Sequence, residues 1–261
     1  MQLPFEQCPA LSALGICRHV FTQRIPGIDV SHDKAEALGC LDSAHREIRR
    51  SIGIGNWPVL TAEQVHGSKI AIVAKPGQTG QLLQQKSVTD RRDTNRRSWA
   101  TQPIDPIGCP SGATRVDLPL ESDVQFASCD GFITNQRKVA LGIHVADCCA
   151  VYIVDPKKPA IGLVHSGKKG TELGVVSNAI AQMKAHFGSN PAELVVQLSP
   201  CIRPPHYEVD FASEIVRQCR ALGVEEIHDA GVCTACDLAR YYSYRAEKGK
   251  TGRMLALIGL E

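Results

Sequence analysis

Long apolar runs dominate the middle of the sequence. Continuous stretches rich in valine and isoleucine, bounded by Asp, Pro, Lys and Gly, occur at Val139–Val145, Ala150–Val154 and Ala160–Val164. Runs of this length and composition predict buried strands rather than helices. Residues 155–159 (DPKKP) have the chemistry of a tight connection, so the second and third runs are expected to form a β-hairpin.

Helical and strand patterns flank this central region. Apolar residues recur at helical spacing in Lys34–Ile52, Thr171–Phe187 and Phe211–Leu222, which predicts three amphipathic helices. Further strands are predicted at Cys17–Gln23, Ser68–Ala74, Phe126–Thr134, Leu194–Leu198 and Met254–Leu260. Because strands and helices do not alternate strictly, the pattern favours an α+β fold with mixed sheets.

Residues 75–125 show neither periodicity. They contain GQTGQLLQQ, DRRDTNRRS and then repeated Pro and Gly, with few side chains suited to a core. We therefore expect a long irregular surface insertion within a single domain that spans residues 1–261. The four arginines in DRRDTNRR are expected to be solvated, with contact to a phosphate-bearing partner as the alternative.

The composition narrows the class of protein. The chain has 261 residues, of which 43% are hydrophobic and 21% charged, as is typical of a globular protein. A net charge of +2 is too small to indicate nucleic acid or an anionic membrane as a partner. No apolar run reaches the about 18 residues of a membrane span, and the first residues lack a signal-peptide pattern. We expect a cytoplasmic protein, and its oligomeric state stays open.

Eleven cysteines are many for that compartment, and their odd number argues against a complete disulfide framework. Cys233 and Cys236 form a C-x-x-C pair near His228, which is half of a zinc ribbon. No matching second pair exists in the sequence, so a buried or redox-inactive pair is favoured. Packing is the expected role of isolated cysteines such as Cys8, Cys17, Cys40, Cys109 and Cys219.

Three residues combine reactive side chains with positions at strand ends. His66 in QVHG, Cys148 in VADCC and His165 in LVHSG each follow an apolar strand and precede a small or turn residue. Two imidazoles and a thiolate suit zinc or copper and leave a fourth position for water or substrate. The spacing leaves two alternatives open: a Cys–His nucleophilic pair, and three residues that are simply packed in the core.

Several motifs follow one another in a characteristic order. QVHG, CDGFIT, ADC and VHSG-x-x-GT are followed by LSPCIRPPHYEVD and YYSYRAEKGKTGRMLALIGL, and FTQRIPGIDVS precedes them. In this order they resemble the multicopper polyphenol oxidase, or laccase-domain, family. Members of that family are also described as purine nucleoside phosphorylases and as peptidoglycan editing factors. The resemblance covers nearly the whole chain except residues 75–125, where the family has a shorter connection.

The resemblance implies an α/β/β/α sandwich with a metal site formed by His66, Cys148 and His165. Zinc is the usual metal, and copper goes with the oxidase description. The implied activities are phosphorolysis of adenosine, inosine, guanosine and methylthioadenosine and deamination of adenosine, so the partners are a purine nucleoside and phosphate. Asp147, beside Cys148, is expected to orient an imidazole, to handle protons or to make a structural hydrogen bond.

One departure from the family concerns the substrate. The family's His-Ala-Gly-Trp-Arg-Gly reads HSGKKG at residues 165–170. Lys169 is a candidate for phosphate, although a lysine binds it only as a point charge, and the missing tryptophan removes a stacking surface. Arg24 and Arg245 are further candidates for an anionic substrate group.

The leading hypothesis is a zinc-dependent purine nucleoside phosphorylase with adenosine deaminase activity. The second is a hydrolase that uses Cys148 to edit peptidoglycan precursors. The third is a non-catalytic protein whose structural zinc takes Cys149 or Cys129 as its fourth ligand. A copper-dependent polyphenol oxidase is the least favoured, because a single site of two histidines and one cysteine is poorly equipped for four-electron oxygen chemistry.

Overall fold

Strand β9 (Cys149–Asp155) is buried along its whole length and on both faces. The computed structural model describes residues 3–73, 115–116 and 123–261. Tyr152 belongs to one hydrophobic core, whereas Val151 and Ile153 belong to a second. Successive side chains of a strand point to opposite faces, so a strand between two cores requires an uninterrupted apolar run. The predicted hairpin with β10 (Ala160–Ser166) is confirmed.

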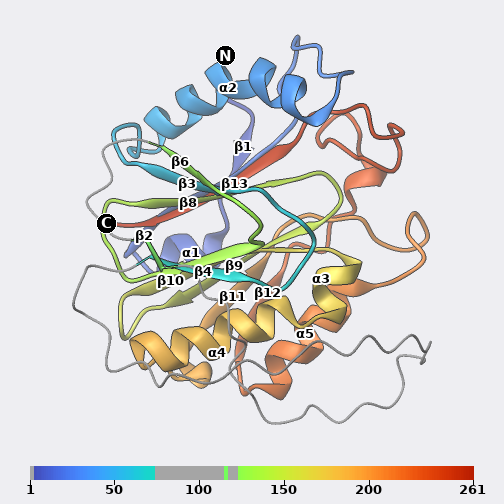
Figure 1. The fold of residues 1–261 in the computed structure, drawn as a ribbon. Coiled ribbons are helices and arrows are strands. Elements are labelled where there is room, and N and C mark those ends of the chain that lie inside the picture. Colours follow the sequence, from blue (N-terminus) through green and yellow to red (C-terminus); the bar gives the residue numbers. More distant parts are fainter. Residues whose placement is uncertain (1–2, 74–114, 117–122) are drawn as a thin grey trace.

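The described strands form two mixed sheets that pack face to face (Figure 1). The first sheet has the order β1 (Phe5–Glu6), β2 (Cys17–Thr22), β13 (Met254–Leu260), β8 (Ala140–Val145), β3 (Val59–Ala62) and β6 (Val124–Phe126). The second has the order β12 (Glu226–Asp229), β11 (Val195–Leu198), β9, β10, β7 (Gly131–Thr134), β4 (Ile70–Val73) and β5 (Arg115–Val116). Parallel pairs such as β3–β8 and antiparallel pairs such as β8–β13 occur in the same sheet.

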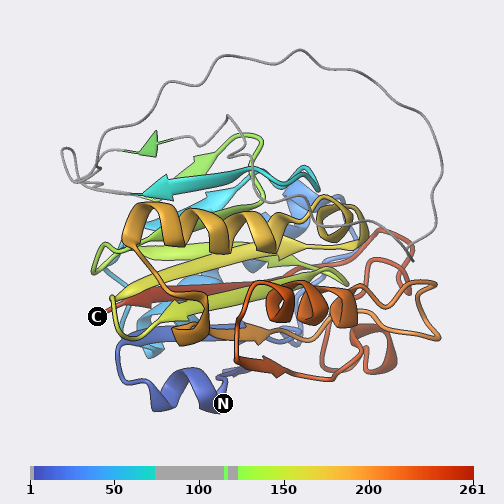
Figure 2. The same ribbon diagram turned by 90° about the horizontal axis from the view of Figure 1, so that it is seen from below.

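Helices cover the outer faces of both sheets. α2 (Lys34–Ser51) lies over the first sheet, and α4 (Val175–Phe187) and α5 (Phe211–Ala221) lie over the second (Figures 1 and 2). The predicted α/β/β/α sandwich is therefore confirmed. The shorter helices are α1 (Pro9–Ala13) and α3 (Lys168–Glu172), with single 3-10 turns at Pro191–Glu193 and Thr234–Cys236. None of the described helices combines the length and apolar character needed to cross a bilayer.

Two element predictions were wrong for local backbone reasons. The expected strand Phe126–Thr134 is two strands in different sheets, because the chain turns at Ser128, whose φ is +52°. The expected helix Thr171–Phe187 is interrupted at Gly174, which has a left-handed φ of +68° and separates α3 from α4. The predicted insertion at residues 75–125 lies outside the described residues, apart from β5 and residues 123–125.

Two buried histidines make folding sensitive to acid. His19 on β2 and His45 on α2 are shielded from solvent, and burial lowers the pKa of each to about 4. The Nε2 atom of His19 accepts a hydrogen bond from the backbone N–H of Cys8 at 2.8 Å, which requires the neutral ring. Both rings are therefore neutral in the folded protein at pH values where the unfolded chain would protonate them.

We predict that His19→Gln weakens the pH dependence of stability between about pH 4 and 6.5. In this window the unfolded chain binds more protons than the folded one, so stability rises with pH, and His19 contributes at most about 1.4 kcal/mol per pH unit to the slope. The glutamine side chain has an oxygen that can accept from Cys8 but does not titrate. Urea unfolding at several pH values measures the slope; equal slopes for variant and wild type would contradict a neutral buried His19.

Candidate metal centre

Two connections between the sheets lie at the same end of the sandwich, and each holds one candidate residue. His66 lies between β3 of the first sheet and β4 of the second. Cys148 lies between β8 of the first sheet and β9 of the second, and His165 is near the end of β10. Gln64 ties the first connection to the end of β8, because its side chain donates to the carbonyl of His144 at 2.7 Å and accepts from its N–H at 3.1 Å.

The structure brings His66, Cys148 and His165 together. One ligand atom from each side chain lies within 4.8 Å of those of the others. The two imidazole rings meet edge to face, with their centroids 4.8 Å apart. His165 is buried, Cys148 is half-buried and His66 is exposed, so the cluster opens to solvent on one side. Two imidazoles and a thiol within this range fit a zinc or copper ion.

A buried carboxylate that the sequence did not single out organises the cluster. Asp130 is fully buried, and its Oδ1 lies 2.9 Å from Nδ1 of His165. The same carboxylate accepts the backbone N–H groups of His66 at 2.9 Å and Gly67 at 2.7 Å. It therefore fixes the ring of His165 with Nε2 free, and it holds His66 in a left-handed conformation at φ +58°.

The site residues perturb one another electrostatically. Burial would raise the pKa of the Cys148 thiol, but His165 and His66 lower it to about 6. Burial would lower the pKa of His165, yet Cys148 and Asp130 raise it to about 9. Burial would also raise the pKa of Asp130, but its hydrogen bonds, above all the one from His165, lower it. These shifts favour the thiolate form of Cys148, which is the form that binds a metal or acts as a nucleophile.

Asp147 makes structural hydrogen bonds. It has a left-handed φ of +82°, and its carboxylate accepts from the hydroxyl of Thr234 at 2.8 Å and from the backbone N–H of Arg245 at 2.7 Å. These bonds attach the connection that carries Cys148 to two loops from the C-terminal part of the chain. Of the three roles expected for Asp147, these contacts support the structural hydrogen bond.

The cysteines proposed as a fourth ligand do not join the cluster. The Sγ of Cys149 faces the carbonyls of Ala150 and Ser199, at 3.5 and 3.7 Å. Cys129 is packed in the core between the sheets. Among the described residues, only His66, Cys148 and His165 group at this position, which leaves room for a fourth ligand from outside the chain.

A cavity of about 1140 Å³ opens over the cluster. Its walls include the three candidate ligands, the aromatic side chains Tyr207, Phe211 and Tyr244, and several cations. Lys169 and Arg245, both proposed for substrate, line this cavity. The volume is sufficient for a nucleoside together with phosphate.

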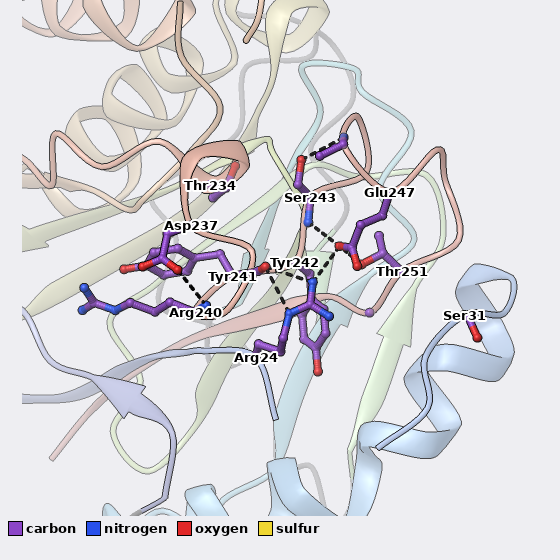
Figure 3. A network of polar contacts seen from close by, with 12 residues as sticks. Arg24, Ser31, Thr234, Asp237, Arg240, Tyr241, Tyr242, Ser243, Glu247 and Thr251 are labelled. Carbon is purple, nitrogen blue, oxygen red and sulfur yellow. Dashed lines mark hydrogen bonds and ion pairs between the residues drawn. The ribbon is translucent and has the colours of Figure 1, made fainter. Parts of the chain in front are cut away.

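Arg24 does not line this cavity. Its guanidinium forms an ion pair with Glu247 at 2.8 Å and donates to the carbonyl of Tyr241 (Figure 3). Glu247 also accepts from the backbone N–H of Ser243 and the hydroxyl of Thr251. The contacts of Arg24 thus hold the loop before β13, and none of them supports its proposed role in substrate binding.

Arg253 is a cavity residue that the sequence analysis missed. It is 9% exposed, and burial lowers its pKa, although a guanidinium stays cationic at neutral pH. Its Nη1 donates to the carbonyls of Thr251 and Gly252, and its guanidinium lies over the ring of Tyr244 at 5.6 Å. Asp147 and Glu247 act on it electrostatically, but no described carboxylate is within salt-bridge distance. Lys34 lines the same cavity. A buried cation without a carboxylate partner is suited to an anionic ligand.

The fold and the cluster define a two-sheet sandwich with a candidate metal centre at the edge where the chain crosses between sheets. The sequence model of the multi-copper polyphenol oxidoreductase laccase family matches residues 18–218 and 209–261. The chain belongs to this family.

Curated relatives carry the name purine nucleoside phosphorylase. YlmD of Bacillus subtilis is 29% identical over 165 residues, which are 51% of this chain and 59% of that protein. The protein SCO2081 of Streptomyces coelicolor is 24% identical over 246 residues, 84% of this chain and 82% of its own. The match thus spans somewhat over half of the first relative and most of the second.

Solved structures show the same fold. YlmD of Geobacillus stearothermophilus superimposes with a TM-score of 0.70, 20% sequence identity and full coverage of both chains. YfiH of Bacillus licheniformis gives a TM-score of 0.67 at 20% identity, over 94% of this chain and 93% of its own.

We predict that Asp130→Asn destabilises the metal-free protein by on the order of 3 kcal/mol. The amide has one oxygen for three donors and turns its NH2 toward a buried N–H group. Asp42→Asn is the matched control, since Asp42 pairs with Arg46 on the exposed face of α2 and its loss is expected to cost less than about 1 kcal/mol. Urea unfolding in the presence of a chelator measures both; equal effects would contradict the role given to Asp130.

Proposed function

We propose that this chain is a zinc-dependent purine nucleoside phosphorylase that also deaminates adenosine. The main support is that His66, Cys148 and His165 meet at the wall of a cavity that is also lined by the buried Arg253. The names of its curated relatives support the nucleoside as substrate. Copper at the same ligands is the alternative metal.

A bound zinc ion would supply Lewis acidity and would make a water molecule acidic at neutral pH. The remaining work belongs to residues of the chain. Asp130 presents Nε2 of His165 and fixes the backbone of His66, so the ligand set is arranged before the metal arrives. Such preorganisation would lower the cost of binding a metal at the wall of the cavity.

Phosphorolysis requires phosphate and nucleoside in one pocket. An oxygen of hydrogen phosphate forms a bond to C1′ of the ribose while the bond from C1′ to the purine nitrogen breaks, and the purine leaves with the proton that the phosphate gives up. Arg253 is the proposed phosphate ligand, because its cation faces the cavity without a carboxylate partner. Tyr207 packs edge to face on Phe211, with centroids 5.9 Å apart, and provides an aromatic wall for the base in place of the family's tryptophan.

Deamination uses the same cavity but a different nucleophile. Water adds to C6 of adenosine, and ammonia leaves with the proton that the water gives up. The cluster stands at the cavity wall, so a base directed toward His66 and Cys148 would place C6 beside it. Inosine is the expected product in the absence of phosphate.

A cysteine hydrolase that edits peptidoglycan precursors is the second candidate, and one observation favours it. Cys148, His165 and Asp130 form a series of thiol, imidazole and carboxylate, in which the carboxylate holds the imidazole at 2.9 Å and the imidazole lies within 4.8 Å of the thiol. This order of groups activates cysteine nucleophiles in amide hydrolysis. Such an enzyme would lose activity on alkylation and keep it in a chelator.

We predict that Cys148→Ala and His66→Ala each remove about one zinc per chain and lower nucleoside turnover about 100-fold or more. Losing a metal ligand is expected to lower activity more than losing a group that only orients a ligand, which costs about 10- to 100-fold in metal affinity or activity. Cys40→Ser, at an exposed position of α2, is the control and should retain both metal and turnover. Metal analysis by mass spectrometry, with adenosine and inosine assays with and without phosphate, tests this. Full activity in chelator together with inactivation by alkylation would favour the hydrolase.

We predict that Arg253→Lys raises the KM for phosphate about tenfold, whereas Lys169→Ala raises it only about two- to threefold. The lysine keeps the charge of Arg253 but loses the bidentate fork, in a buried setting where hydrogen bonds matter most. Lys169 is exposed, so its attraction for phosphate is weakened by solvent. Initial rates against phosphate concentration measure both; the opposite order would place phosphate beside α3.

A further inference from the structure

A second group of metal-binding side chains lies apart from the first centre and shares no residue with it. It consists of His206, Cys233 and Cys236, whose ligand atoms all lie within 4.8 Å of one another. Cys236 is the last residue of the single 3-10 turn Thr234–Cys236, and Cys233 directly precedes this turn. Its histidine partner is His206, from the turn after β11, and not the nearby His228, which instead contacts Glu226 at 3.0 Å.

The distances match the edges of a coordination tetrahedron. Nδ1 of His206 lies 3.4 Å from Sγ of Cys236 and 3.9 Å from Sγ of Cys233. Zinc bonds of about 2.3 Å to sulfur and 2.0 Å to nitrogen at tetrahedral angles place such atoms about 3.6 Å apart. Small side-chain rotations would therefore seat an ion among the three atoms. Two thiolates would neutralise its charge, which lowers the cost of binding near the surface.

The backbone around the group is held on both sides. The N–H of Cys201 donates to the carbonyl of Val232 at 3.1 Å, and the N–H of Thr234 donates to the carbonyl of Cys201 at 3.2 Å. Arg203 forms an ion pair with Asp229. These contacts hold the two loops that carry the ligands against each other, so the three side chains are presented by a well-supported backbone.

We propose that His206, Cys233 and Cys236 form a second zinc site, with water as the fourth ligand. Two thiolates and one imidazole favour a borderline-soft ion such as Zn²⁺ over Mg²⁺ or Ca²⁺. His206 and Cys236 are exposed, so the ion can enter directly from solvent.

This second zinc would brace one wall of the cavity. His206 adjoins Tyr207, which lines the cavity and stacks beneath the guanidinium of Arg245 at 5.4 Å. Thr234, between the two cysteines, donates its hydroxyl to Asp147 beside Cys148. An ion that ties these loops together would therefore restrain residues on the cavity wall without contacting the substrate. The proposal does not depend on which reaction the first centre performs.

The test is zinc content of the full chain after reduction, removal of metal and reloading with zinc. Wild type is expected to hold two ions, Cys236→Ser one and Cys148→Ala one, and the double variant none. Cys40→Ser, another exposed cysteine, is the matched control with two ions. His206→Ala is a second variant that leaves both thiols in place and is expected to weaken the second ion. Wild type with a single zinc that Cys148→Ala alone removes would overturn the proposal.

A thermal measurement isolates the second site. In Cys148→Ala, which lacks a first-centre ligand, free zinc at 100 times its dissociation constant should raise Tm by about 5–10 °C. The rise should disappear in Cys148→Ala/Cys236→Ser. Peptide mapping of the reduced, zinc-loaded protein would overturn the proposal if it found a disulfide between Cys233 and Cys236, since a disulfide removes both thiolates.

Discussion

The candidate metal centre depends on the buried carboxylate of Asp130. Asp130 lies just before β7, yet it binds the connection between β3 and β4 through His66 and Gly67, and it binds β10 through His165. A carboxylate without solvent is costly unless each oxygen has donors, and here two backbone amides and one imidazole supply them. One side chain thereby stabilises the end of the sandwich and sets the direction of two candidate ligands.

The loop before β13 places the other functional groups by a comparable network. The carboxylate of Glu247 pairs with Arg24 and accepts hydrogen bonds from the N–H of Ser243 and the hydroxyl of Thr251 (Figure 3). The same loop carries Tyr244, Arg245 and, at its end, Arg253 to the cavity. Arg24, a candidate for direct contact with substrate on sequence grounds, acts in the structure as a positioning residue for that loop. Its positive charge is already satisfied inside the protein.

The sequence predicts those features of the fold and site that depend on a local pattern of apolar and polar residues. Strands such as β13 follow from apolar runs, because a strand that is buried on both faces needs one. The three candidate ligands stand out because they lie at or after the ends of such runs. Asp130 was overlooked because its partners come from residues 66 and 165, and no local pattern marks a carboxylate whose donors are so distant. The pairing of Cys236 with His206 rather than His228 has the same cause, since only the fold brings two separate turns together.

β4 ends and β6 begins at the end of the sandwich that lies away from the candidate metal centre. β4 leaves the connection that holds His66 and runs away from it, and β6, parallel to β3, runs back toward that end. The segment between Val73 and Val124 is therefore joined to the sandwich at strand ends that face away from the candidate centre. A change in the length of this segment would enter the sandwich at those strand ends and leave the contacts of Asp130 with His66, Gly67 and His165 in place.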